Sequence, residues 1–109
     1  MPFKVLLTAD AYQDLLDICD YIAASDSNSK ALYVLGKLET VINGLNENPE
    51  RGGKVRELSE LGIPDFREFH FKPYRIIYRV TNDCVYIMVV TDGRRDMQAL
   101  LQRRLFETR

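Results

Sequence analysis

The sequence has few of the residues that build metal and disulfide sites. Its 109 residues include two cysteines and one histidine. Cys19 and Cys84 lie far apart and neither belongs to a Cys-x-x-Cys pair, so cysteine and histidine alone cannot assemble a zinc ligand set. We expect two reduced thiols and no metal site. The glycine loops that bind phosphates or dinucleotides are also missing, so no cofactor is expected.

Long hydrophobic runs are missing too. No apolar run approaches the ~18–20 residues that a membrane-spanning helix needs. The apolar stretch near the N-terminus, Phe3–Leu7, is too short for a secretory signal. These absences favour a cytoplasmic protein with no membrane partner. The length, with 46% hydrophobic and 28% charged residues, is typical of one ordered domain, which we place at residues 1–109.

The net charge of −1 hides a division between the two halves of the chain. Residues 1–50 carry 3 basic and 8 acidic side chains, and residues 51–109 carry 12 basic and 8 acidic ones. All ten arginines lie in the second half. Because arginine binds phosphate and carboxylate groups through two hydrogen bonds, this half could form an anion-facing surface. The pattern equally fits a solvated surface whose sign varies along the chain.

The first half of the chain predicts a strand followed by two helices. Phe3–Leu7 is short, apolar and typical of a strand. Apolar residues then recur at helical spacing over roughly 9–24, with polar residues such as Asp14 on the opposite, solvent-facing side. After a polar break, a second helix runs from Ala31 to Leu45. Two helices joined by so short a link should form an antiparallel hairpin.

The second half predicts strands and a final helix. Val55–Leu58 could be a short strand or edge. Phe66–Phe71, Tyr74–Val80 and Val85–Val90 read as strands joined by tight turns. Arg94–Arg109 reads as a C-terminal helix. The order predicts an α+β fold: an N-terminal strand and a helical hairpin packed on a small twisted antiparallel sheet, with a C-terminal helix.

The strand Tyr74–Val80 predicts two different sheet faces. Its even positions, from Tyr74 to Val80, are all apolar and belong to the core under the helical hairpin. Its odd positions are Arg75, Ile77 and Arg79, a mixed face that cannot be fully dry. We therefore expect this second face to be partly open, with Arg75 and the Arg94–Arg95 pair converging on it.

Four groups of motifs follow one another along the chain: Ala11…Asp14-Leu15…Ile18…Tyr21-Ile22; Asn48-Pro49-Glu50-Arg51-Gly52; Phe66-Arg67-Glu68 leading to Pro73-Tyr74-Arg75-Ile76-Ile77-Tyr78; and Asp92-Gly93-Arg94-Arg95-Asp96. In this order and spacing they resemble the RelE/ParE superfamily, the toxins of type II toxin–antitoxin modules. The resemblance covers nearly the whole chain. It implies a small twisted sheet backed by an N-terminal helical hairpin, and a cognate antitoxin, ParD-like or RelB-like, that neutralises the toxin. A toxin of this kind could form a homodimer or a toxin–antitoxin hetero-oligomer.

The resemblance implies one of two activities. RelE-like members cut messenger RNA on the ribosome, and ParE-like members poison DNA gyrase. RNA cleavage by a 2′-hydroxyl needs a base, an acid and cations around the phosphate. Arg75 and one of Arg94 or Arg95 match the arginines that RelE-like enzymes place there. Leucines occupy positions 100 and 101, where those enzymes tend to have a polar group, so the ParE-like activity is favoured.

The candidate site residues follow from these two activities. If the protein is a ribonuclease, the catalytic residues are Arg75, Arg95, His70 and Glu68, with Glu68 orienting His70 from the same strand face. The residues expected to contact the target or the antitoxin are Arg67, Arg75, Arg79, Arg94, Arg95, Arg103 and Arg104.

Several of these arginines also have a purely structural interpretation. Arg75 could pair with Glu68 or Asp92. One of Arg94 and Arg95 could pair with Asp92 or Asp96. Arg103, Arg104 and Arg109 are expected to form a solvated basic face.

Three functions are therefore weighed. The favoured one is a ParE-like toxin that inhibits gyrase without catalysing a reaction. The first alternative is a RelE-like, ribosome-dependent mRNA endonuclease. The second is an inactive family member that retains only antitoxin binding.

Overall fold

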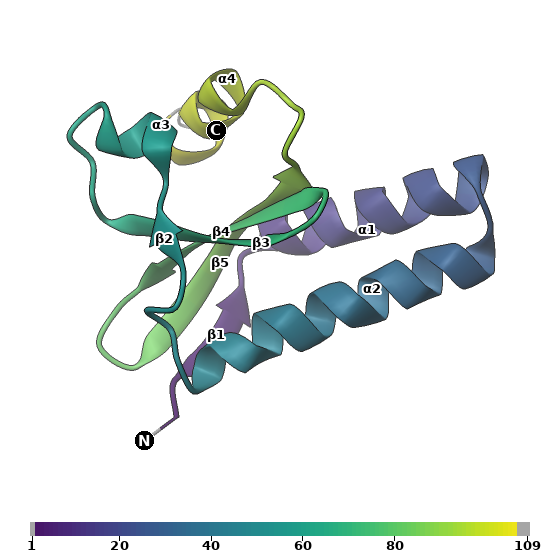
Figure 1. Cartoon of the computed structure of the whole chain (residues 1–109), viewed down its shortest axis with the longest axis horizontal. Coiled ribbons are helices and arrows are strands. Elements are labelled where there is room, and N and C mark those ends of the chain that lie inside the picture. Colours follow the sequence, from purple (N-terminus) through teal and green to yellow (C-terminus); the bar gives the residue numbers. More distant parts are fainter. Residues whose placement is uncertain (1, 107–109) are drawn as a thin grey trace.

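The computed structural model describes residues 2–106 and consists of one sheet with helices on both faces (Figure 1). The elements are β1 (Lys4–Leu7), α1 (Ala9–Ser25), α2 (Asn28–Asn43), a 3-10 turn (Gly44–Asn46), β2 (Gly53–Lys54), α3 (Arg56–Ser59), β3 (Phe66–Phe71), β4 (Tyr74–Val80), β5 (Cys84–Asp92), α4 (Met97–Leu101) and a π-helical turn, η2 (Gln102–Phe106). The α+β fold class is confirmed. Over the described residues, no helix is long and apolar enough to cross a membrane.

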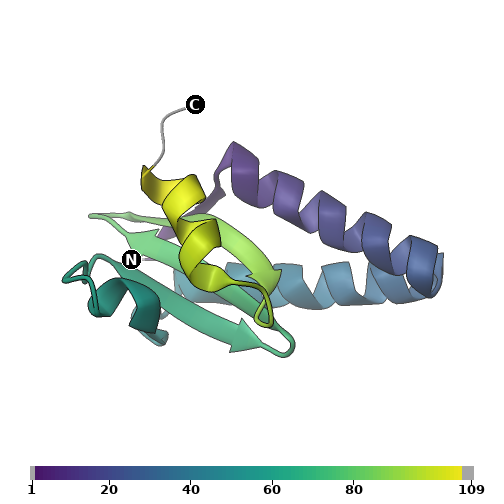
Figure 2. The ribbon, with the colours of Figure 1, turned by 90° about the horizontal axis from the view of Figure 1, so that it is seen from above.

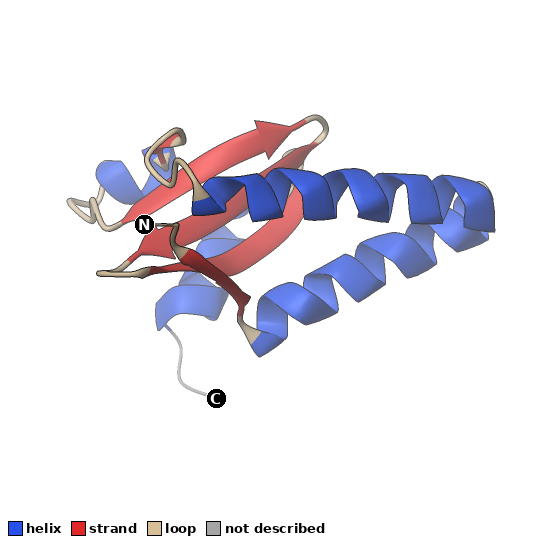
Figure 3. Cartoon of the chain, turned by 90° about the horizontal axis from the view of Figure 1, so that it is seen from below, coloured by secondary structure: helices blue, strands red, loops and turns tan. Residues whose placement is uncertain are grey.

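The two long helices form the predicted hairpin along one face of the sheet (Figure 3). The side chain of Thr8 accepts a hydrogen bond of 3.1 Å from the backbone N–H of Ala11, and that of Ser27 accepts one of 3.0 Å from Lys30. These caps satisfy N–H groups that have no partner inside a helix, so they fix where α1 and α2 begin. The apolar stripes of both helices are buried in one core with the hairpin-facing side of β4 and β5.

The sheet is mixed, with the strand order β1-β5-β4-β3-β2. The pairs β2–β3, β3–β4 and β4–β5 are antiparallel, whereas β1 pairs with β5 in parallel. Ile77 pairs with Val89 and Tyr78 with Ile87, so Met88 is an extra residue at a bulge. The bulge shifts the alternation of β5, and as a result Val85, Ile87 and Val90 face the hairpin while Val89 faces the other side.

The second face is more covered than predicted: Arg79 stays exposed on it, but its centre is closed. The even positions of β4 do pack under the hairpin, as expected. On the other side, however, α3 and α4 lie over the sheet (Figure 2). They bury Ile77 completely and reduce the exposure of the Arg75 side chain to 15%.

Two element predictions on this second face are also corrected. The segment Val55–Leu58 is not a strand, because the helix α3 begins at Arg56. This helical turn brings Val55 and Leu58 to the same side, where both are buried in a second core. The other buried residues of this second core are Ile77, Val89, Met97, Leu100 and Leu101. The C-terminal helix begins at Met97 rather than Arg94, since the side chain of Asp96 accepts a hydrogen bond of 3.2 Å from Ala99 and caps it there. The predicted end of this helix, Arg109, lies outside the described residues.

Candidate functional site

Arg75 lies at the centre of a cluster of charged side chains between β3, β4 and α3. Its Nε donates to Glu68 Oε1 at 2.7 Å, and its Nη1 and Nη2 donate to the two carboxylate oxygens of Glu57 at 3.1 and 2.9 Å. The side chains of all three residues are largely covered, with 12–15% of their surface exposed. The guanidinium of Arg75 is therefore occupied by two carboxylates rather than open to an incoming phosphate.

The electrostatics of the cluster favour this closed arrangement. The hydrogen bonds to Glu57 raise the pKa of Arg75 above its usual range, an effect that Glu68 reinforces and burial opposes. The hydrogen bonds from Arg75 lower the pKa of Glu57, against the opposing effect of burial. Both groups are thus charged at neutral pH, and the pair is a charge-assisted, bidentate one.

His70 lies at the edge of the cluster. Its Nε2 is 3.4 Å from Glu68 Oε2, and 58% of its side chain is exposed. Three of the four residues predicted as catalytic, Arg75, Glu68 and His70, are therefore neighbours. The fourth, Arg95, is exposed and makes no ion pair within the described part of the chain.

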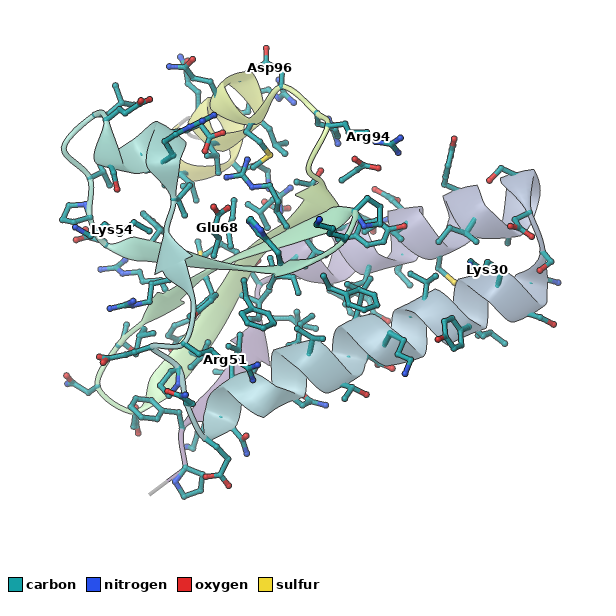
Figure 4. All side chains as sticks on the ribbon, in the orientation of Figure 1. Lys30, Arg51, Lys54, Glu68, Arg94 and Asp96 are labelled. Carbon is teal, nitrogen blue, oxygen red and sulfur yellow. The ribbon has the colours of Figure 1, made fainter. Side chains whose placement is uncertain are left out.

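Arg94 pairs with Asp92, so the expectation that one of the two adjacent arginines would bind a nearby aspartate is confirmed. Its Nε and Nη2 donate to the Asp92 carboxylate at 2.9 and 2.6 Å, and its backbone N–H donates to the same carboxylate at 2.9 Å. Hydrogen bonds from Arg94 lower the pKa of Asp92. The Arg94 side chain remains 84% exposed. It lies on the loop between β5 and α4 (Figure 4). Arg94 and Arg75 therefore bind different acidic residues and do not form one anion site.

The remaining predicted contact residues divide into exposed and structural ones. Arg79 and Arg103 are exposed and make no ion pair among residues 2–106. Arg67 donates to the carbonyl oxygen of Gly52 at 3.0 Å and so supports the loop before β2. The expectation that Arg104 is solvated is wrong. Its side chain is 13% exposed and folds back onto Asp14, which explains why Asp14 does not face solvent either.

A cleft of about 520 Å³ opens between α1 and the end of β5. Ile18 and Val90 contribute apolar surface to it, Tyr21 and Tyr74 contribute aromatic surface, and the remaining lining residues are Asp14, Asp17, Pro73, Thr91, Asp92, Arg94 and Arg95. Burial raises the pKa of Tyr74. The cleft combines apolar walls with charges of both signs, which suits the binding of a peptide segment better than a single small anion.

No cluster of three or more metal-ligating side chains occurs in residues 2–106.

The position where a ribonuclease of the RelE kind would need a polar group holds Leu100 and Leu101, and both are buried in the second core. Neither side chain can accept or donate a proton.

Sequence reasoning missed two residues that complete the charged contacts. Glu57 was not singled out because its segment was assigned to a strand, and only the helical turn of α3 aims it at Arg75. Asp14 was assigned to the solvent-facing side of α1. The one available signal in the sequence was an arginine on a half-buried strand, because a partly buried positive charge needs acidic partners.

The fold is shared with known toxins. It is similar to a chain in the structure of the chromosomal ParDE toxin–antitoxin system from P. aeruginosa, with a TM-score of 0.70 and 21% identity over 83% of this chain and 95% of that one. It is also similar to a chain in the RelBE2 toxin–antitoxin complex from Mycobacterium tuberculosis, with a TM-score of 0.56 and 25% identity over 84% and 92%. A mutant of the E. coli toxin RelE in the free state matches with a TM-score of 0.62 and 15% identity over 92% and 93%.

These likenesses define the class of fold, which the chain shares with toxins of the RelE and ParE kinds. A curated relative, Toxin ParE3 of Caulobacter vibrioides, is 28% identical over 101 residues, which cover 93% of this chain and 97% of that protein. Residues 5–97 match the family described as the ParE toxin of the type II toxin–antitoxin system parDE. The chain belongs to this ParE toxin family.

Proposed function

We propose that the protein inhibits DNA gyrase by binding it, and that a cognate, ParD-like antitoxin neutralises it. The single observation that carries this proposal is the state of Arg75, whose guanidinium donates to both Glu57 and Glu68. In a ribonuclease of the RelE kind this arginine would have to face the scissile phosphate. In a toxin that acts by binding, it can serve as a structural link instead.

The alternative of a ribosome-dependent mRNA endonuclease keeps one supporting observation. His70 is half exposed and lies 3.4 Å from Glu68, an arrangement that can orient an imidazole as a general base. For this activity to operate, Arg75 would have to leave Glu57 and Glu68 and turn to the phosphate. Breaking two charge-assisted contacts in a largely covered site costs about 3 kcal/mol or more, so the binding function is favoured.

The proposed antitoxin partner is supported by the related structures, which are described as a ParDE system and a RelBE2 toxin–antitoxin complex. An antitoxin segment that orders on binding needs a groove with apolar walls and charged rims. The cleft between α1 and β5 has apolar and charged lining residues, with Arg94 and Arg95 among the charged ones. We propose that Arg94 and Arg95 contact the antitoxin there, and that the exposed Arg79 and Arg103 are available to the target.

The test uses gyrase, supercoiled plasmid and the purified protein, with and without the co-purified antitoxin. The expected result is linear plasmid trapped in gyrase–DNA cleavage complexes, which disappears when the antitoxin is present. A parallel reaction with translating ribosomes should leave the message intact. Message cleavage would favour the endonuclease, and inactivity in both reactions with retained antitoxin binding would identify an inactive family member.

A further inference from the structure

The edge of the sheet at β2 carries three positive side chains on one face. β2 is the last strand in the sheet order, and its Lys54 pairs with Arg67 of β3. Residues that pair across two strands place their side chains on the same face, so Lys54 and Arg67 are neighbours. Arg51, on the segment that leads into β2, covers Phe69 on that same face, with its guanidinium carbon 4.3 Å from the ring centre (Figure 4). We call Arg51, Lys54 and Arg67 the basic edge.

The positive charge of the basic edge is not balanced locally. Its three residues make no ion pair within residues 2–106. The carboxylates of Glu57 and Glu68, which lie close to the basic edge in the sequence, are already bound to Arg75. Glu50 precedes Arg51 but does not pair with it. Because the whole chain has a net charge of −1, this excess of positive charge belongs to the edge and not to the protein in general.

Gly53 leaves the backbone of this edge open to close approach. Its φ does not lie in the left-handed region, and a Cβ built on it would meet nothing within 4 Å among the described residues. The neighbouring Gly52 is different, since a Cβ there would collide with the carbonyl oxygen of Glu68. Glycine weakens a strand, and within strands it often marks a place where a ligand or another backbone comes close. The packing of the chain itself therefore does not explain Gly53, whereas a partner outside the chain does.

The chemistry of the basic edge fits the backbone of duplex DNA. Arginine and lysine N–H groups bind phosphate oxygens, and such contacts need no particular base sequence. Single-stranded nucleic acid would need an exposed aromatic ring for its bases to stack on, but Phe69 is half-buried and covered by Arg51. A peptide segment would need apolar pockets, and the cleft that offers apolar walls, between α1 and β5, contains none of the three residues of the basic edge.

We propose that the basic edge binds the phosphate backbone of duplex DNA, with Gly53 allowing the DNA to approach the strand. This contact goes beyond the inhibition of gyrase and does not depend on it. If the protein does act on gyrase, the basic edge would face the DNA that gyrase holds, while the cleft between α1 and β5 serves the antitoxin.

The test measures fluorescence anisotropy of a labelled duplex of about 30 base pairs with the purified protein, without gyrase, between about 50 and 200 mM salt. The logarithm of the association constant should fall with the logarithm of the salt concentration with a slope of about −0.9 for each phosphate contact, or about −2.7 in total. Lys54→Ala and Arg51→Ala should each make this slope shallower by about 0.9 and weaken binding about tenfold at the lowest salt. Gly53→Ala should weaken binding without changing the slope. Lys37→Ala, which removes the same charge from an exposed position on α2, is the control and should change neither quantity.

Four results would overturn the proposal. The first is a protein that does not bind the duplex at the lowest salt, whether or not it inhibits gyrase. The second is an equal loss of binding in Lys54→Ala and Lys37→Ala, which would indicate a general effect of charge. The third is tighter binding to a single strand of the same sequence, and the fourth is equally effective competition by polyglutamate, which would assign the basic edge to an acidic protein segment. DNA binding that follows the predicted pattern in a protein without effect on gyrase would support the basic edge and contradict only the proposed function.

Discussion

The carboxylate of Glu57 and the guanidinium of Arg75 meet through two hydrogen bonds of 2.9 and 3.1 Å and join α3 to β4. Glu68 on β3 completes the cluster at 2.7 Å. Three elements that are separate in the sequence are thereby fixed over the second face of the sheet. An arginine held in this way contributes to the fold more readily than to phosphate chemistry.

Replacing Arg75 should destabilise the protein because it leaves two largely covered carboxylates without a counter-charge. Arg75→Ala is expected to lower the free energy of unfolding by about 2–4 kcal/mol. Urea denaturation measures this change. Arg79→Ala is the control, since Arg79 lies on the same strand but is exposed, and it should change the free energy by less than about 0.5 kcal/mol. Equal effects of the two substitutions would show that the cluster does not hold the fold together.

The lowered pKa of Glu57 predicts how stability depends on pH. The hydrogen bonds from Arg75 hold the pKa of Glu57 below its usual value in the folded protein, so the unfolded state binds the proton more readily. The stabilisation is therefore fully present above the unfolded pKa and is lost as the pH falls through the lower, folded pKa. Glu57→Gln should flatten the decline of the free energy of unfolding between about pH 5 and pH 3. The exposed Glu60, substituted by glutamine, is the control, and a decline unaltered by Glu57→Gln would contradict the assignment.

The hydroxyl of Tyr78 fastens the loop that precedes β2. It donates to the carbonyl oxygen of Pro49 at 2.7 Å and accepts from the backbone N–H of Gly52 at 3.0 Å, and both hydrogen bonds are buried. Tyr78→Phe leaves both backbone groups without a partner and should cost about 1–3 kcal/mol of unfolding free energy. Gly52→Ala should also destabilise, since a Cβ there would lie 2.5 Å from the carbonyl oxygen of Glu68. Tyr12→Phe, on an exposed tyrosine, should have no effect in the same thermal or urea melts.

Substitution of Arg95 allows the affinity for the antitoxin to be measured without a change in the stability of the fold. Arg95 is exposed and makes no ion pair in the described part of the chain, so Arg95→Ala should leave the unfolding free energy within about 0.5 kcal/mol of its original value. If Arg95 faces an acidic group of the antitoxin, the same substitution should weaken the complex by about 1 kcal/mol, or roughly fivefold in Kd. Calorimetric titration measures the affinity. Arg56→Ala removes the same charge from α3, and a loss of affinity equal to that of Arg95→Ala would indicate a general charge effect.

The parts of the fold that depend on local periodicity could be predicted from the sequence. Leu15 and Leu38 lie on apolar stripes with helical spacing, and Tyr78 lies at an apolar position of an alternating strand, so each was expected in the core and is buried there. The parallel pairing of β1 and the bulge at Met88 have no local signature. Both depend on contacts between distant segments. The pairing of β1 depends on where the helical hairpin brings the chain back to the sheet, and the bulge depends on which side chains of β5 pack into the second core.

The candidate site was predicted less well because it depends on contacts between distant residues. Arg104 and Asp14 are 90 residues apart, and Arg75 and Glu57 are 18 apart. Neither pairing alters the apolar pattern of its own segment, which would look the same if both arginines faced water. The neighbouring positions of Glu68 and His70 could be predicted, because residues two apart on a strand share a face.

Cleavage of a message on translating ribosomes tests most directly whether Arg75 is structural or catalytic. Primer extension on the message would detect new ends after incubation with the purified protein and with Arg75→Ala. With Arg75 held by Glu57 and Glu68, we expect no new ends in either reaction, while gyrase–DNA cleavage complexes form with the unmodified protein. New ends that appear with the unmodified protein and vanish with Arg75→Ala would contradict this account.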